Sequence, residues 1–171
     1  MTAEQTVRPG MQRGGIEEWL AAMSPELLAY FVRRVVPSED AADLLGETLL
    51  VLWRRADAIP DDDRAARMWA FGVARNVLRG HRRTSLRRSG LADRLRAELG
   101  SSGGVAPSAD VRVLDLRAAI DGLKPIDREI VRLVHWEGLT LVETAELLGR
   151  REGTVRSRYH RARSVLRKQL G

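Results

Sequence analysis

Four hydrogen-bonding side chains near the end of the chain are spaced so that they would share one face of a helix. They are Arg156, Ser157, His160 and Arg161. The opposite face would carry apolar side chains that we expect to pack inward, namely those of Val155, Tyr159, Ala162 and Leu166. Arginine can bridge guanine O6 and N7 in the major groove, and serine or histidine can reach base edges or phosphates. The pattern indicates a helix that reads DNA, with Thr154 and free backbone amides near its start as phosphate donors.

The residues before this helix are suited to position it. Thr140 and Glu143 form a Thr-x-x-Glu capping box that opens a helix over residues 141–148, and Gly149 closes that helix. After three further residues the final helix is expected to begin, near residue 153 or 154. A helix, a tight turn and a helix is the layout of a common DNA-binding motif. The alternative is an ordinary surface helix with arginine on its wet side, and the capping box and short turn count against it.

The first 83 residues show helical periodicity, and no run alternates as a strand would. Ser24 and Pro25 are expected to open a helix that Pro37 stops, and Ser38 to cap the next one, which ends near Arg55. A long helix is predicted over residues 64–83. The expected buried positions are Ile16, Trp19, Leu20 and Met23, then Leu28, Phe31, Val32 and Val35, then Ala41, Leu45, Leu49 and Leu52, and finally Trp69, Val73 and Val77.

The second helical region follows a stretch rich in serine and glycine. Residues 84–110 read as a linker with one short helical candidate at 91–99. Beyond it, apolar stripes are formed by Val113, Leu116, Ile120 and Leu123, and, after Pro125, by Ile126, Ile130, Leu133 and Val134. We therefore predict an all-α protein of two small helical domains joined by a flexible linker. The predicted limits are 1–15 for a flexible N-terminus, 16–83 and 111–171 for the domains, and 84–110 for the linker.

Charge and composition narrow the class of partner. The 171 residues include 29 Lys plus Arg and 23 Asp plus Glu, a net charge of +6. Residues 1–60 carry a net charge of −3, whereas 61–110 carry +4 and 111–171 carry +5. This asymmetry favours two kinds of partner surface, with the basic parts facing a polyanion such as nucleic acid. Cysteine is absent, which excludes thiolate metal sites and a cysteine nucleophile, and we find no signal peptide or membrane span, so we expect a cytoplasmic protein.

Two blocks of sequence resemble the bacterial extracytoplasmic-function (ECF) sigma factors of the sigma-70 family. In the second half, residues 127–130, 137–140, 145–149, 153–158 and 160–163 look like sigma region 4. In the first half, residues 42–45, 47–48 and 52–54 look like region 2.2, and residues 69–71, 73–76 and 81–83 look like regions 2.3 and 2.4. Two blocks in this order with a linker between them are far more specific than a helix-turn-helix alone.

The resemblance implies a subunit that joins core RNA polymerase and directs it to a promoter. The polymerase contact would involve Asp43, Gly46, Glu47 and Trp53, and the spacing independently places Asp43, Glu47 and Arg54 on one helix face. Without the resemblance, these acids would read as a solvated stripe. The resemblance also implies an anti-sigma factor as inhibitory partner, no membrane insertion, no cofactor and no catalytic residue.

The resemblance further implies that the first domain opens the minus 10 element and traps a flipped base beside the loop at residues 59–64. The residues expected to contact this element are Asp63, Arg64, Arg75, Asn76, Arg79, Arg82 and Arg83. Region 4 would read the minus 35 element through Thr154, Arg156, Ser157, His160 and Arg161, while Arg158 and Arg163 would serve phosphates or acidic groups of a partner. Trp69 is expected in the core rather than under a stacked base.

Three positions depart from the family pattern. Gly46 replaces a common glutamine, Thr144 replaces an apolar residue, and Arg151 stands where a small capping residue or proline is usual. We expect Arg151 to add a phosphate contact and so raise the salt sensitivity of DNA binding.

Two other function classes stay open. A stand-alone helix-turn-helix regulator would explain the end of the chain but not residues 43–53. An enzyme is disfavoured by three scattered histidines, and the acids at 61–63 are explained by helix capping rather than by a metal site.

Overall fold

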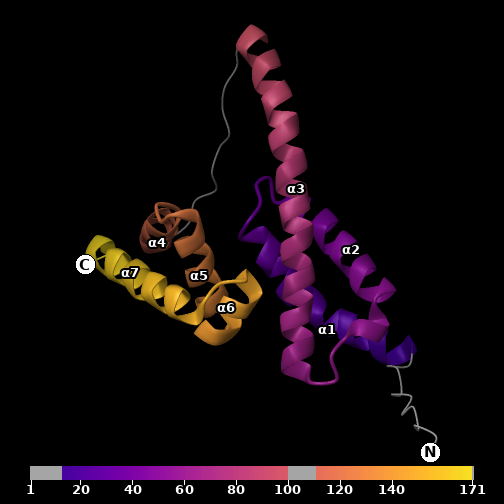
Figure 1. Ribbon diagram of the computed structural model, residues 1–171. Coiled ribbons are helices and arrows are strands. Elements are labelled where there is room, and N and C mark those ends of the chain that lie inside the picture. Colours follow the sequence, from indigo (N-terminus) through magenta and orange to yellow (C-terminus); the bar gives the residue numbers. More distant parts are fainter. Residues whose placement is uncertain (1–12, 100–110, 171) are drawn as a thin grey trace, which may run out of the picture. The chain divides into compact units, whose positions relative to one another are not determined.

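The computed structural model describes residues 13–99 and 111–170, and every regular element in them is a helix (Figure 1). These residues divide into two compact units, with the boundary between Glu98 and Leu99. The predicted all-α architecture with two helical parts is confirmed. The predicted flexible N-terminus lies outside the described residues up to residue 12, and so does the part of the predicted linker at 100–110. In the described residues no helix is both long enough and apolar enough to cross a membrane.

The first unit contains α1 (Arg13–Val32), α2 (Glu39–Arg54), a short 3-10 helix η1 (Ala56–Ala58) and α3 (Asp63–Leu99). Its core is aromatic where α1 meets α3. The Tyr30 ring lies 5.3 Å from the ring of Phe31 and 5.7 Å from that of Phe71, and all three side chains are fully buried. The salt bridge from Arg67 to Glu26, at 2.8 Å, joins the same two helices. These contacts hold α1 against the first half of α3.

The prediction that Pro25 opens a new helix is wrong. Helix α1 passes through Pro25 without a break, and the Ser24 hydroxyl donates to the carbonyl of Leu20 at 2.7 Å instead of capping. Met23 and Leu27, on either side of the proline, are both buried. Burying a side chain of this size contributes about 1.5–3 kcal/mol. Two such residues on one continuous face outweigh the helix bond that proline forfeits, which costs about 3 kcal/mol.

The predicted apolar stripes of α1 and α2 are shifted by one residue in places. In α1, Leu28 and Val32 are exposed, whereas Leu27 and Tyr30 are fully buried together with the predicted Phe31. In α2 the buried positions are Ala41, Leu44, Thr48 and Leu52, while Leu45 and Leu49 are half-buried. Both helices are apolar at several adjacent positions. Periodicity alone therefore fits two neighbouring stripes equally well, and packing selects one.

The ends of α2 and α3 also differ in part from the prediction. Ser38 occupies the N-cap position of α2 but makes no side-chain capping bond. Asp62 caps α3, because its carboxylate accepts the backbone N–H of Ala65 at 2.8 Å. The helical end predicted near Arg83 is too early, since α3 continues to Leu99.

The second unit contains α4 (Val111–Asp121), α5 (Pro125–His135), α6 (Leu141–Leu148) and α7 (Glu152–Leu170). Helix α7 packs against the other three helices. The predicted inward face is confirmed, because Val155, Tyr159 and Ala162 are buried and Leu166 is half-buried. Of the stripe predicted for α4, Ile120 and Leu123 are buried, Leu116 is exposed, and the Val113 side chain lies outside the described ones.

The predicted capping chemistry at both ends of α6 is confirmed. The Thr140 hydroxyl accepts the backbone N–H of Glu143 at 3.2 Å, and the Glu143 carboxylate accepts the backbone N–H of Thr140 at 2.7 Å. Gly149 has φ +61°, the left-handed conformation that ends a helix and that residues with a side chain rarely adopt. Helix α7 begins at Glu152, one residue earlier than expected.

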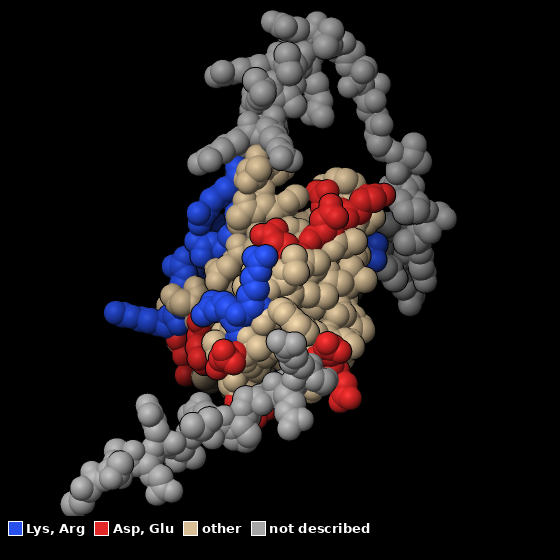
Figure 2. Space-filling model, turned by 90° about the vertical axis from the view of Figure 1, so that its right-hand side faces the viewer, with Lys and Arg blue, Asp and Glu red and all other residues tan. Residues whose placement is uncertain are grey.

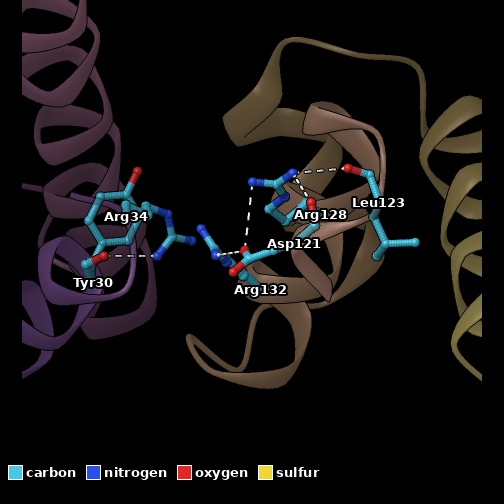
Figure 3. A network of polar contacts seen from close by, with 6 residues as sticks. All are labelled: Tyr30, Arg34, Asp121, Leu123, Arg128 and Arg132. Carbon is cyan, nitrogen blue, oxygen red and sulfur yellow. Dashed lines mark hydrogen bonds and ion pairs between the residues drawn. The ribbon is translucent and has the colours of Figure 1, made fainter. Parts of the chain in front are cut away.

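Arginine side chains donate hydrogen bonds to main-chain carbonyls in each unit (Figure 3). In the first unit, Arg34 donates to the carbonyl of Tyr30 at 3.0 Å, and its guanidinium lies 3.8 Å from the centre of the Tyr30 ring. In the second unit, Arg128 donates to the carbonyls of Asp121 and Leu123, and Arg132 donates to the Asp121 carboxylate at 3.0 Å. The two bonds from Arg128 satisfy carbonyls at and just after the end of α4, and the bond from Arg34 satisfies one in the last turn of α1.

Candidate nucleic-acid interface

The outward face of α7 carries the side chains that the sequence pattern singled out. Arg156, Ser157, His160 and Arg161 are all exposed, opposite the buried Val155, Tyr159 and Ala162. Thr154 is exposed as well, but its backbone N–H donates to the carbonyl of Arg151 at 3.0 Å. A phosphate contact there would therefore fall to the Thr154 hydroxyl. The face combines donors and acceptors on a rigid element, as reading base edges requires.

Both arginines of this face already have partners within α7. The guanidinium of Arg156 forms an ion pair with the carboxylate of Glu152, four residues earlier. Arg161 Nε lies 3.4 Å from the carbonyl oxygen of Ser157. The sequence analysis missed Glu152, although the i,i+4 spacing of an acid and an arginine was a signal that could have found it.

Contacts on the other side of α7 fix its orientation in the second unit. Arg158 donates to the carboxylate of Asp127 in α5 at 2.9 Å. The Tyr159 hydroxyl lies 3.0 Å from Nε2 of His135, and the two rings stack with centroids 5.8 Å apart. The guanidinium of Arg163 lies 5.7 Å from the centre of the Tyr159 ring. Arg158, which was expected to serve phosphates or acidic groups of a partner, is paired with an acid of its own unit.

A second basic surface follows α3. At 100° per residue, Arg75, Asn76, Arg79, Arg82 and Arg83 fall within roughly a third of the helix circumference. Arg75 is half-buried and the other four are exposed. Arg64 lies on the same side of α3 near its start, whereas Asp63 points to a different side. Figure 2 shows Lys and Arg side chains as a column along one edge of the molecular face that it draws.

The exposed face of α2 mixes acidic and apolar side chains. One side of α2 carries four exposed residues that the sequence analysis named, and the exposed fraction of Trp53 is 41%. They are Asp43, Gly46, Glu47 and Trp53. Leu50, which the sequence analysis missed, lies near the middle of the same face and is 57% exposed. Large apolar side chains flanked by charge are typical of a surface that meets a protein partner. We call these residues, Asp43, Gly46, Glu47, Leu50 and Trp53, the α2 face.

Trp69 and the acidic run at 61–63 have structural surroundings. Trp69 is half-buried, with the guanidinium of Arg55 5.6 Å from its ring centre, so it is only partly in the core, where it was expected. Asp62 caps α3, which agrees with the capping interpretation. Among the described residues, no group of three or more His, Cys, Asp or Glu side chains is placed to hold a metal ion.

Both units match known families. Residues 21–88 match the family described as Sigma-70 region 2, and residues 114–166 match the family described as Sigma-70, region 4. The ECF RNA polymerase sigma factor SigL of Mycobacterium tuberculosis is 31% identical over 153 residues, which cover 84% of this chain and 82% of that protein. EcfG of Rhodopseudomonas palustris, also an ECF RNA polymerase sigma factor, is 34% identical over 152 residues, which cover 88% of this chain and 81% of that protein.

Solved structures support the same fold. The sigma factor RpoE of Bartonella quintana, in complex with the anti-sigma factor NepR, superposes with a TM-score of 0.72 and 24% identity, over 90% of this chain and 95% of that chain. CnrH, in complex with the cytosolic domain of CnrY, superposes with a TM-score of 0.63 and 21% identity, over 92% of this chain and 88% of that chain.

Proposed function

We propose how this protein works from the premise that the chain belongs to the ECF sigma factors of the sigma-70 family, as its two family matches and its relatives show. The protein is an RNA polymerase sigma factor, which directs core polymerase to promoters. In our proposal the chain supplies binding surfaces and no catalytic residue, and the polymerase performs nucleotide addition. We place the protein in the cytoplasm, with the polymerase. The proposed domains are residues 16–83 and 111–171, joined by residues 84–110, of which 84–99 continue α3.

The α2 face supports the proposal that the chain binds core polymerase. Asp43 and Glu47 add negative charge beside Leu50 and Trp53, and all four side chains are exposed in the first unit. Such a face fits a partner that is basic around an apolar centre. A stand-alone helix-turn-helix regulator would need only the second unit and leaves this face without a use. The alternative is therefore not favoured.

The two basic surfaces divide promoter recognition between them. The α3 arginines would hold the separated strand of the minus 10 element by its phosphates, and the amide of Asn76 can both donate to and accept from a base edge. Arg64, at the start of α3, continues this surface toward the loop at 59–64. Asp63 lies off the surface, so its role at the minus 10 element is limited to that loop. The outward face of α7 would read the minus 35 element in duplex form, with Arg156 and Arg161 as base-contacting residues and Thr154 on a phosphate.

The test is reconstitution. Purified protein is mixed with bacterial core RNA polymerase, and co-elution is followed by gel filtration. Run-off transcription from host promoter DNA is then measured with the complex. Co-elution with promoter-dependent transcripts is the expected result. Symmetric DNA binding by the protein alone, with neither association nor transcription, would support the stand-alone regulator instead.

We also infer that an anti-sigma factor regulates this protein. RpoE of Bartonella quintana was solved in complex with its anti-sigma factor NepR, and this chain shares its fold. Exposed apolar side chains occur in both units, including Leu50 and Trp53 in the first and Trp136 and Val142 in the second. An inhibitor could cover such surfaces. Pull-down from the native host while the promoter is silent should recover an inhibitory protein, and repeated failure to do so would count against this partner.

A further inference from the structure

Glu152, the first residue of α7, forms an ion pair with Arg156 one turn further along the helix. The bond joins Nη2 of the guanidinium to Oε1 of the carboxylate. The Glu152 side chain is 44% exposed and the Arg156 side chain 57% exposed, so the pair lies at the surface of the helix rather than in the core. The contact therefore belongs to the outward face of α7.

We propose that Glu152 is a positioning residue for promoter reading, which holds the Arg156 guanidinium in the orientation that meets a guanine. The inference rests on the proposed role of α7 at the minus 35 element. A guanidinium carries five N–H donors in a planar fork. The bond to Glu152 uses one of the two Nη2 donors, and the other Nη2 donor still lies beside a donor of Nη1 or Nε, so one two-donor edge remains for O6 and N7 of guanine.

The ion pair favours selectivity in two ways. An exposed arginine samples many rotamers, and ordering it opposes binding, so a partner that orders it beforehand lowers that cost. A carboxylate at the DNA surface also repels phosphates at every sequence. Glu152 thus disfavours contacts that carry no sequence information while supporting the contact that does.

Arg161 provides the contrast within the same helix. The residue four positions before it is Ser157, whose carbonyl oxygen lies 3.4 Å from Arg161 Nε. The two arginines lie on the same outward face, yet the carboxylate partner occurs at Arg156. We therefore expect the effect of Glu152 to be confined to the base that Arg156 contacts.

The experiment uses the full chain bound to core polymerase and a duplex library in which both promoter elements are randomised. Sequences bound by the wild type, Glu152→Gln, Arg156→Ala and the double variant are counted. Arg156→Ala should abolish the preference at one base position. Glu152→Gln should weaken the preference at that same position by about three- to tenfold, which lies within the range for coupled residues in contact. In the Arg156→Ala background, Glu152→Gln should change no preference further.

Glu146→Gln is the matched control, because it removes another exposed acid, in α6, and leaves the partner of Arg156 in place. It should leave every base preference unchanged. If Arg156→Ala alters no preference, the proposed reading by this arginine fails. If Arg156→Ala removes a preference that Glu152→Gln leaves intact, the positioning role is overturned while base reading stands. Two further outcomes would overturn the positioning role. If Glu152→Gln raises binding to all duplexes equally, Glu152 acts only by repelling phosphates. If Glu152→Gln lowers the Tm with and without Arg156 and leaves the base preferences unchanged, Glu152 acts only on helix stability.

Discussion

The carboxylate of Asp127 in α5 accepts a hydrogen bond from the guanidinium of Arg158 in α7, with Oδ1 and Nη1 2.9 Å apart. The Asp127 side chain is only 16% exposed and that of Arg158 is 34% exposed. The two residues are 31 positions apart in the chain. Arg158 lies between the exposed Ser157 and the buried Tyr159. Its bond to α5 therefore helps to fix the rotation of α7 about its axis, and so the direction in which the outward face of α7 points within the second unit.

Asp127→Ala should destabilise the second unit by about 1–3 kcal/mol, because it leaves a largely covered guanidinium without its charged acceptor. Urea unfolding of the full chain, followed by circular dichroism, measures the change. Arg158→Ala in the Asp127→Ala background should then cost little more, since the bond is already lost. Additive losses from the two substitutions would show that the residues act independently.

Thr144→Val should stabilise the protein by about 1 kcal/mol. Thr144 is fully buried and its hydroxyl has no hydrogen-bond partner among the described residues, so valine of the same shape removes a desolvated polar group. Thr48 is the matched control, because it is equally buried but its hydroxyl donates to the carbonyl of Leu44 at 2.7 Å. Thr48→Val should not stabilise. Thermal unfolding of both variants checks the pair, and equal shifts would contradict the explanation.

Gly46→Ala should raise the free energy of unfolding by about 0.5–1 kcal/mol, because glycine weakens a helix interior. A Cβ at this position in α2 would meet no atom of the described residues within 4 Å, so the substitution introduces no clash with them. Gly149 is equally open but has φ +61°, and Gly149→Ala should destabilise instead. Urea unfolding of the two variants measures this difference. Stabilisation by Gly149→Ala would show that the turn before α7 is not constrained as described.

Asp43→Arg combined with Glu47→Arg should lower the affinity for core polymerase at least about tenfold, because like charges at an interface cost several kcal/mol. Co-elution by gel filtration and a titration of labelled protein measure the loss. The control reverses two exposed acids of α1, Glu17→Arg with Glu18→Arg, which produces the same change in net charge. Binding retained by the α2 variant, or lost equally by both, would remove these acids from the interface.

Local rules predicted the parts of the structure that depend on neighbouring residues. The capping box of Thr140 and Glu143, the left-handed Gly149 and the helix start at Pro125 follow from backbone bonding within a few positions. Pro25 was misread because burial on both sides of it outweighs its local preference. The choice between Leu27 and Leu28 for the core depends on what α1 packs against, which periodicity does not contain.

The geometry of the candidate surfaces was predicted in part. Spacing placed Arg156 and His160 on the outward side of α7, since one helix determines that geometry. The sequence analysis missed Leu50, because its search for partner-binding positions rested on charged residues and on the family resemblance, and neither singles out a leucine. The partner of Arg158 could not be predicted, because Asp127 reaches it only through the packing of α5 on α7.

The two basic surfaces should respond differently to the loss of one arginine. Arg82→Ala in α3 should weaken holoenzyme binding to promoter DNA at every sequence and reduce the slope of log affinity against log salt by about 0.7–0.9, because a phosphate contact is lost. Arg161→Ala in α7 should instead cost about 1–3 kcal/mol at the sequence whose base it contacts and much less when that base is changed. Affinities measured at several salt concentrations, on one promoter and on single-base variants of its minus 35 element, separate the two. An equal loss at every sequence from Arg161→Ala would refute base reading by that residue, while a sequence-dependent loss from Arg82→Ala would show that α3 does more than hold phosphates.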